Sequence, residues 1–264
     1  MPRLPGVPVL LYHGLTTGAE ADGVRRDGKY WIRDMVFREH LSLIHRGGYR
    51  VALLRDLWGP AGAHVDPGTA VVLTFDDGRA SDYDSAFPLL LEAGVQAEFF
   101  LNTASIDDRG FLGWAQIGEM RRAGMSFQSH SHDHVALVGL PTRQVERQLT
   151  DSKRLLEDGL GRAVDFMAVP YGFLNGRIVK CAQAVGYRAV CSSRQWPARP
   201  GARTVSRVAV YRHTTTRHIC RLLEGNPGTY LARRMRSAFL YLPKRLLLRF
   251  HPGPLGVRLL EREA

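Results

Sequence analysis

The sequence predicts an α/β fold with a parallel sheet, because short apolar strands alternate along the chain with helical segments. Several of these helical segments end at a glycine before the next strand begins. Repeated strand–helix–strand units of this length favour either a closed β/α barrel or a doubly wound sheet. No linker and no internal repeat divides the 264 residues, so one large α/β domain is expected.

The positions of the elements follow from the spacing of apolar residues. Strands are expected at residues 7–12, 71–75, 96–101, 126–129, 166–169, 187–191 and 207–211. Helices are expected at residues 37–47, 86–93, 114–123, 143–156 and 175–185.

The composition is that of an ordinary globular protein, with 45% hydrophobic and 23% charged residues. Its three cysteines have neither a disulfide-framework nor a zinc-finger spacing, which indicates free thiols in a reducing compartment. We find no secretory leader and no apolar run long enough to span a bilayer. These observations predict a cytoplasmic protein.

The positive charge is concentrated near the C-terminus. The formal net charge is +11, and residues 221–264 contribute nine basic and three acidic residues to it. We therefore divide the chain into a body, residues 1–220, and a basic, partly amphipathic extension, residues 221–264. The extension could be a terminal helix packed on the body or a peripheral contact with an anionic membrane, at the inner membrane face. Pro243 interrupts its apolar pattern and favours the packed helix. No basic motif with interleaved aromatic residues is present, so no nucleic acid is expected as a partner.

Two adjacent carboxylates, Asp76 and Asp77, follow the apolar strand at residues 71–75. Carboxylates at the end of a buried strand are costly unless they pair with a cation or share a proton. Adjacent side chains point in different directions, so one could bind a metal ion while the other faces a substrate. The following Gly78 also suits a plain turn, and taken alone this motif favours the turn over a metal site.

Three histidines, His130, His132 and His134, follow the strand at residues 126–129. Neutral imidazole is the commonest protein ligand for zinc, and three histidines in five residues are hard to explain by core packing. The spacing therefore favours a metal site over a solvated loop. A third motif, residues 168–172, ends another strand with Pro170 and Tyr171. It is either a plain turn or a bend that directs a backbone N–H at a substrate carbonyl.

These three motifs, in this order, resemble those of the polysaccharide deacetylases of carbohydrate esterase family four. The resemblance covers about residues 5–212 and includes the opening strand that ends at His13. It implies a distorted, incomplete β/α barrel of about seven strands, with residues 1–220 as the catalytic domain. The implied reaction is the metal-dependent removal of acetyl groups from an N-acetylated oligosaccharide or polysaccharide of the N-acetylglucosamine type.

Carried over by position, the resemblance makes Asp77, His130 and His134 the metal ligands and Asp76 the general base. The implied ion is divalent, zinc first, with cobalt or nickel as alternatives. The backbone N–H of Tyr171 would stabilise the oxyanion. His13, Trp114 and Pro170 are candidates for substrate contact.

The chain departs from the family pattern at two points. The family commonly has an arginine two residues before the proline of the third motif, where it orients the base, and this chain has Ala168. The usual histidine motif that supplies the general acid is also missing. His13 and His213 are weak candidates for that role, so the acid stays unassigned.

Two other readings remain open. A catalytically silent carbohydrate-binding relative would account for both departures. An amidohydrolase barrel acting on a small cyclic amide also uses a pair of histidines one residue apart, but it takes that pair from its first strand rather than from the middle of the chain.

Overall fold

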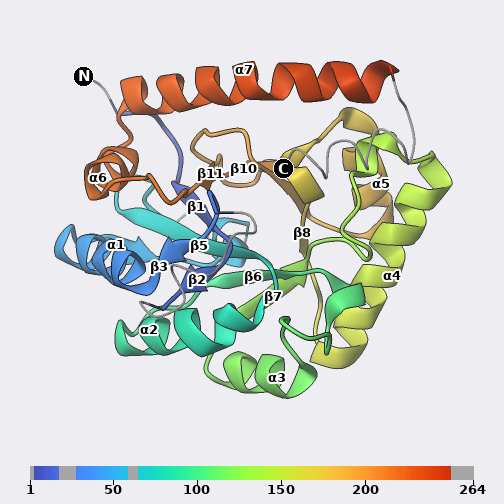
Figure 1. The fold of residues 1–264 in the computed structure, drawn as a ribbon, viewed down its shortest axis with the longest axis horizontal. Helices are drawn as coiled ribbons and strands as arrows, with labels where there is room; N and C mark the ends of the chain where they lie inside the picture. The colour runs from blue at the N-terminus through green and yellow to red at the C-terminus, as the bar shows by residue number, and fades with distance from the viewer. Residues whose placement is uncertain (1–2, 18–27, 59–64, 251–264) are drawn as a thin grey trace.

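The computed structural model describes residues 3–17, 28–58 and 65–250, with side chains described as far as residue 239. Within these residues, parallel strands form a barrel-like sheet that helices surround (Figure 1). The strands are β1 (Val9–Tyr12), β2 (Leu15–Thr16), β3 (Ile32–Arg33), β4 (Arg50–Val51), β5 (Ala70–Asp77), β6 (Glu98–Leu101), β7 (Ser126–Ser129), β8 (Phe166–Ala168), β9 (Ala189–Ser192), β10 (Thr204–Ser206) and β11 (Val208–Ala209). The predicted distorted β/α barrel is confirmed.

The main helices are α1 (Asp34–Arg46), α2 (Phe87–Glu92), α3 (Trp114–Arg122), α4 (Thr142–Leu160), α5 (Gly176–Val185), α6 (Thr216–Leu223) and α7 (Pro227–Phe250). Short helical turns are η1 (Leu54–Leu57), η3 (Asp82–Ala86), η4 (Thr103–Ser105), η5 (Leu137–Gly139) and η6 (Pro170–Gly172). Each helix that was expected in the body is present within a few residues of its predicted position. The sequence did not predict α6, β2, β3, β4 or β10, which are short.

The strand order of the barrel is β10–β9–β8–β7–β6–β5–β1–β11, and β4 pairs with β5 beside this path. The order closes on itself through one short segment, residues 204–209. Its first half, β10, pairs with β9, and its second half, β11, pairs with β1. Arg207 lies between the two halves. Counting this segment once, the described strands on the path occupy seven positions, as the resemblance implied.

The side chains of β5 separate the two parts of the core. Leu73 and Phe75 pack toward the helices, whereas Val72 belongs to the buried cluster inside the barrel. Successive side chains of a strand point to opposite faces, so Thr74 and Asp76 also face the barrel interior. The strand therefore delivers a carboxylate to the inside of the barrel at its C-terminal end.

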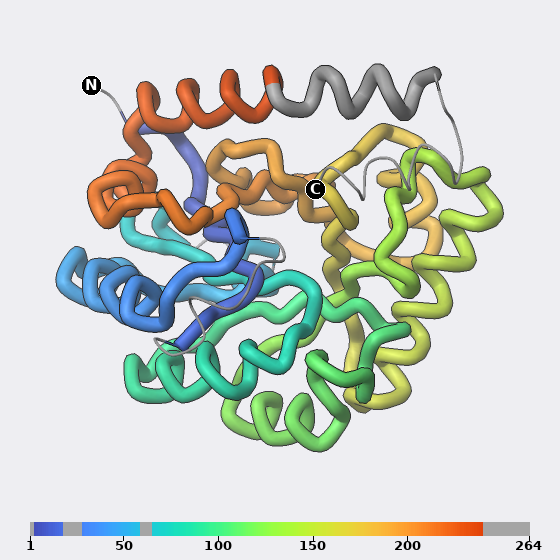
Figure 2. Tube along the Cα trace, in the orientation of Figure 1, coloured from blue at the N-terminus to red at the C-terminus, as the bar shows by residue number. Residues whose placement is uncertain are grey.

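The C-terminal helices cover one side of the barrel (Figures 1 and 2). Helix α6 spans residue 220, where the boundary between body and extension was expected. Helix α7 packs through Tyr230, whose hydroxyl donates to the carbonyl of Leu222 at 3.0 Å. The break in the apolar pattern at Pro243 does not end the helix, since α7 continues to Phe250. A proline removes one hydrogen bond and can bend a helix without ending it. Residues 251–264 of the predicted extension lie outside the described residues.

A buried histidine on α1 makes the stability of the fold sensitive to acid. His40 is fully buried, with Nδ1 3.2 Å from the Tyr12 hydroxyl oxygen, and burial lowers its pKa to about 4. The unfolded chain, with a histidine pKa near 6.5, therefore binds a proton between pH 6.5 and pH 4 that the folded chain does not. This contribution to stability is complete above pH 6.5 and is lost as the pH falls toward 4.

We expect this effect to lower the free energy of unfolding by about 2 kcal/mol between pH 7 and pH 5. His40→Gln should lose that part of the pH dependence, whatever its stability at pH 7. Urea unfolding of both proteins at the two pH values measures the difference. An equal fall in both proteins would contradict the assignment.

Candidate metal and catalytic site

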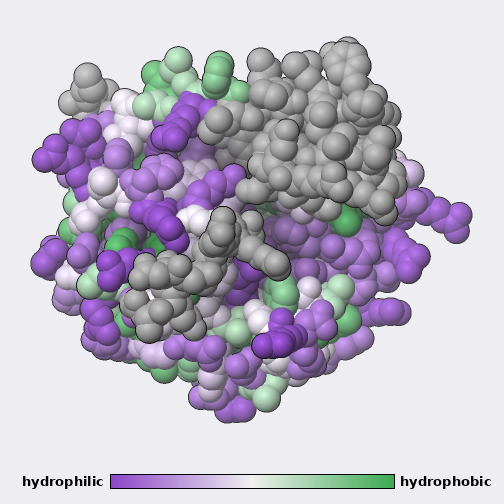
Figure 3. All heavy atoms as spheres, viewed as in Figure 1, coloured by the Kyte–Doolittle hydropathy of each residue, from purple (hydrophilic) through white to green (hydrophobic). Residues whose placement is uncertain are grey.

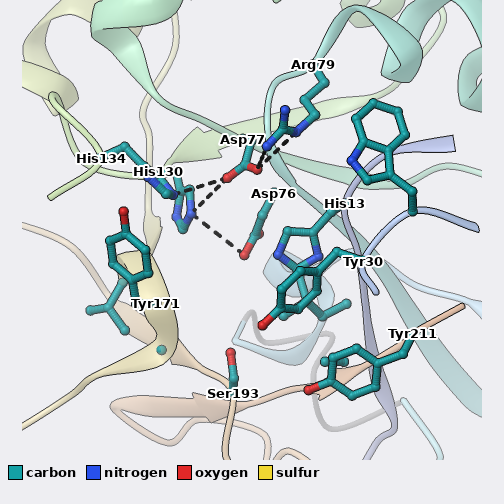
Figure 4. Close-up of a pocket in the computed structure, with 15 residues that line it drawn as sticks. His13, Tyr30, Asp76, Asp77, Arg79, His130, His134, Tyr171, Ser193 and Tyr211 are labelled. Atoms are coloured by element: carbon teal, nitrogen blue, oxygen red, sulfur yellow. Dashed lines mark hydrogen bonds and ion pairs between the residues drawn. The ribbon is translucent and has the colours of Figure 1, made fainter. Parts of the chain in front are cut away.

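A pocket opens at the C-terminal ends of the barrel strands, where β/α-barrel active sites lie (Figure 4). Seven of the polar side chains that line it come from residues at or just after the ends of five strands. They are His13 after β1, Asp76 and Asp77 at the end of β5, His130 and His134 after β7, Ser193 after β9 and Tyr211 after β11. Tyr171, which follows β8, lies on the side of His134, and His13 and Tyr30 lie on the opposite side of the carboxylates (Figure 4).

The two adjacent aspartates have different surroundings. Asp76 continues the strand and faces the buried interior. Asp77 has a left-handed backbone, with φ of 80°, which turns its carboxylate toward the histidines. A non-glycine residue in this conformation is strained by about 1–3 kcal/mol. Ser131, His134 and Tyr171 are in the same region, with φ of 72°, 52° and 59°. Strained backbone is thus gathered around the pocket, as is common at functional sites.

Asp77, His130 and His134 form a set of three ligand atoms that fits a metal ion. Oδ1 of Asp77 is 3.5 Å from Nε2 of His130 and 3.2 Å from Nε2 of His134. All three ligand atoms lie within 4.8 Å of one another. Ligands of a tetrahedral zinc ion, each about 2.1 Å from the ion, lie about 3.4 Å apart. Two nitrogens and one carboxylate oxygen at these distances fit zinc or a similar divalent ion and leave a coordination position open.

The neighbours of these ligands fix their orientation. Nδ1 of His130 is 3.0 Å from the carbonyl oxygen of Ala168, so an Nδ1–H would donate to that oxygen and leave Nε2 available as a ligand. Arg79 donates from Nε and Nη2 to Oδ2 of Asp77, at 3.2 and 2.9 Å. Oδ1 of Asp77 is therefore the oxygen that faces His130 and His134.

The charges in the pocket shift the pKa values of its carboxylates. Burial would raise the pKa of Asp77, but its hydrogen bonds with His130 and His134 hold the pKa well below the usual value. Burial would likewise raise the pKa of Asp76, but the charge and hydrogen bonds of Arg207, together with His130 and His13, lower it below its usual value. Both carboxylates are therefore ionised at neutral pH.

Arg207 makes the closest contact with Asp76. Its Nη1 and Nη2 donate to the two carboxylate oxygens at 2.6 and 2.7 Å, and both residues are buried. This pair could not be predicted from local sequence patterns, because Asp76 and Arg207 are 131 positions apart. One signal was available: an arginine at the start of an apolar strand needs a partner if the strand is buried. Arg207, in the segment that closes the barrel, thus provides the guanidinium that pairs with Asp76. Ala168 has no group that could make this contact.

His13 lies beside the carboxylates, with its ring 4.5 Å from that of Tyr30 (Figure 4). Its Nδ1 is buried and has no hydrogen-bond partner within the described ranges. Burial lowers the pKa of His13, against the opposing effect of Asp77 and Asp76. A histidine with a purely structural role normally has its buried ring nitrogens bonded, so this one is a candidate for chemistry.

Several residues singled out from the sequence lie elsewhere. Trp114, at the start of α3, packs on α4, where a side chain at Gly159 would collide with it. Pro170 is buried between two residues of the pocket wall without lining the pocket itself. His213 is exposed and stacks on Tyr211, with ring centroids 5.5 Å apart. Ser193 and Tyr211 also line the pocket and were not singled out from the sequence, although the strand expected at residues 207–211 ends at Tyr211.

The sequence is similar to those of known deacetylases. Residues 64–190 match the family described as polysaccharide deacetylase. The Bacillus subtilis protein YxkH, assigned to the polysaccharide deacetylases, is 28% identical over 183 residues, which cover 69% of this chain and 62% of that protein. The poly-beta-1,6-N-acetyl-D-glucosamine N-deacetylase of Staphylococcus epidermidis is 24% identical, over 62% of each chain. This chain therefore matches less than two thirds of the length of either relative.

The fold is shared with solved structures. IcaB from Ammonifex degensii superimposes with a TM-score of 0.72 and 26% identity, covering 84% of this chain and 97% of that one. The Streptococcus pyogenes deacetylase PplD gives a TM-score of 0.74 at 21% identity, covering 83% and 99%, which supports the fold alone. The matched segment and the relatives show that the chain is similar in sequence to the polysaccharide deacetylases, and the solved structures show that it shares their barrel fold.

Proposed function

We propose that the chain hydrolyses the acetamido group of an N-acetylglucosamine-type residue in an oligosaccharide or polysaccharide, releasing acetate and a free amine. The observation that supports this most is that two neighbouring carboxylates have different partners, which suits them to different roles. Asp77 joins two histidines in a metal-binding set, while Asp76 stays outside that set and is held by Arg207. The curated relatives include N-deacetylases of poly-beta-1,6-N-acetyl-D-glucosamine and of peptidoglycan.

A divalent ion bound by Asp77, His130 and His134 would lower the pKa of a water molecule and polarise the acetyl carbonyl. Asp76, ionised and fixed by Arg207, is placed to accept the proton of the attacking water. The water oxygen forms the new bond to the carbonyl carbon, and the carbon–nitrogen bond then breaks. The backbone N–H of Tyr171, a residue that lines the pocket, is the proposed donor to the oxyanion.

We assign to His13 the transfer to the leaving nitrogen of the proton that Asp76 takes from the attacking water, because burial lowers the pKa of His13 and leaves its ring without an acidic proton of its own at neutral pH. It lies across the carboxylate pair from His134, and the sugar amine would leave between them (Figure 4). His13→Gln should lower acetate release about 100-fold, because the amine must then take its proton from water. His213→Gln serves as the matched control, since His213 is exposed and outside the pocket. Equal loss in both variants, or loss only at His213, would overturn the assignment.

The size of the pocket agrees with a polymeric substrate. Its volume is about 270 Å³, near the lower end of the range for small-molecule sites. It therefore accommodates the reacting sugar, with the neighbouring sugars of a polymer outside. Tyr30 and Trp31 form part of its wall and offer apolar surface to a sugar ring.

The test is acetate release from N-acetylglucosamine oligomers, measured on the native chain, on the chelator-treated chain and after zinc or cobalt is restored. We expect activity that disappears on chelation and returns with the ion. A parallel assay with a small cyclic amide tests the amidohydrolase reading. Zinc binding with no turnover of any N-acetylated sugar would favour the silent carbohydrate-binding relative, and no metal binding would overturn the proposal.

The place where the reaction occurs also remains a proposal. Among the described residues, no helix combines the length and the apolar character needed to cross a bilayer. A cytoplasmic location, with contact at an anionic membrane face, is tested by fractionating cells that express the chain. Recovery only outside the cytoplasm would exclude it.

A further inference from the structure

Helix α7 carries an apolar stripe on the side that faces away from the barrel. Leu231, Met235 and Phe239 are 53%, 64% and 79% exposed. They follow one another at intervals of four, so they lie along one face of the helix. Figure 3 shows apolar surface over the N-terminal half of α7. A helix packed on a globular body normally turns its apolar side chains inward, so packing does not account for this stripe.

The opposite face of α7 makes the contacts with the barrel. Tyr230 is fully buried, with its ring 6.0 Å from that of Trp196. Arg233 donates to the carbonyl oxygen of Ala209 on β11 and, at 3.2 Å, to Oε1 of Gln195. These contacts fix the rotation of the helix. The exposure of the stripe therefore follows from the way α7 is anchored.

Arginines flank the stripe on both sides. Successive residues of a helix are about 100° apart, so Arg234 and Arg236 stand on either side of Met235. Both are exposed, and Arg234 lies over the Trp196 ring, 5.3 Å from its centroid. Long basic side chains beside an apolar face can extend to lipid headgroups while the face enters the acyl boundary.

We propose that this surface of α7, the stripe Leu231–Met235–Phe239 with Arg234 and Arg236, docks on an anionic lipid membrane. The basic charge of this region distinguishes between three possible partners, namely a membrane, a second copy of the chain and a nucleic acid. A second copy of the chain would bring two arginine-flanked helices together, and residues 221–264 carry nine basic against three acidic residues. A nucleic acid would leave the apolar stripe in water. An anionic bilayer would bury the apolar stripe and pair its lipid headgroups with the arginines. This docking does not depend on the proposed reaction.

The test is co-sedimentation of the full chain with vesicles of phosphatidylglycerol and phosphatidylcholine, compared with vesicles of phosphatidylcholine alone. We expect binding to the anionic vesicles only, with an affinity that falls as salt is raised. The double change Arg234→Gln with Arg236→Gln should weaken binding about 30-fold, from about fivefold for each basic residue. Arg234→Lys with Arg236→Lys should preserve it, because the charge remains.

Replacing the stripe by Leu231→Ser, Met235→Ser and Phe239→Ser should lower the affinity at least about tenfold. Matched controls exist on other helices. Leu91 and Met35 are 49% and 51% exposed, and Arg121 and Arg122 are exposed on α3. Leu91→Ser with Met35→Ser, and Arg121→Gln with Arg122→Gln, should bind as the native chain does.

Equal losses in the control variants would show general charge attraction and overturn the proposal. So would a stripe variant that binds normally. Sedimentation velocity tests whether a second copy of the chain covers the stripe instead. A dimer that is lost in the stripe variant, together with no vesicle binding by the native chain, would identify the second copy as the partner and overturn the membrane proposal. Circular dichroism melts confirm that each variant is folded.

Discussion

Asp76→Asn is expected to lower acetate release from N-acetylglucosamine oligomers by about 10²–10⁴-fold, the usual contribution of a general base. The amide has nearly the same shape as the carboxylate but cannot take the proton of the attacking water. Asp76 does not belong to the metal-binding set of Asp77, His130 and His134, so zinc binding should persist. Acetate release and zinc titration on the same protein sample measure the two properties.

Asp77→Ala provides the matching experiment at the neighbouring position. It removes the oxygen that lies 3.2 Å from His134 and 3.5 Å from His130, so both zinc binding and acetate release should be lost. The pair of variants thus separates base from ligand. If Asp76→Asn lost zinc, or if Asp77→Ala kept it, the two roles would be wrongly assigned.

Arg207→Met is expected to cost about 3–5 kcal/mol of folding free energy, because it leaves the buried carboxylate of Asp76 without its charged partner. Acetate release should also fall, mainly in kcat, since the base loses its fixed orientation while the pocket wall stays in place. Urea unfolding and steady-state kinetics measure the two effects. Asp76→Asn combined with Arg207→Met should cost less than the sum of the single changes, because no unpaired charge remains.

A rescue experiment tests the role of Arg207 more sharply than loss alone. Ala168 and Phe100 lie in the same buried cluster inside the barrel, and the Arg207 guanidinium is 5.0 Å from the Phe100 ring. Ala168→Arg in the Arg207→Met background would return a guanidinium to this region from the position that the family commonly uses. Partial recovery of kcat is expected. Ala168→Leu is the control for bulk, and equal recovery with leucine would show that packing, not orientation of the base, was lost.

The strand ends could be predicted from the sequence because they are local. Apolar runs end at Asp76, His130 and Tyr171, and parallel strands bring their C-terminal ends to one edge. Local sequence patterns do not show which distant segments of the chain pair in the fold. Arg207 meets Asp76 only because the chain closes the barrel at residues 204–209. Tyr211, at the end of the strand expected at residues 207–211, reaches the pocket from the same closing region and was not singled out as a candidate.

One aromatic residue that was expected to contact substrate lies elsewhere. Trp114 was a candidate for substrate contact, yet it packs against α4. A large ring is equally suited to stacking on a sugar and to filling a core, and the sequence does not distinguish the two.

The closing segment also sets the order in which the protein can become functional during synthesis. Strands β1 and β11 pair across nearly the whole body of the chain, Leu10 with Val208 and Leu11 with Ala209. Until the ribosome has released residue 209, β1 and β9 are open edges, and Asp76 has no Arg207. A nascent or truncated chain that stops earlier therefore lacks both a closed barrel and the Arg207–Asp76 ion pair. Barrel closure and formation of this buried ion pair at the pocket are the same late event.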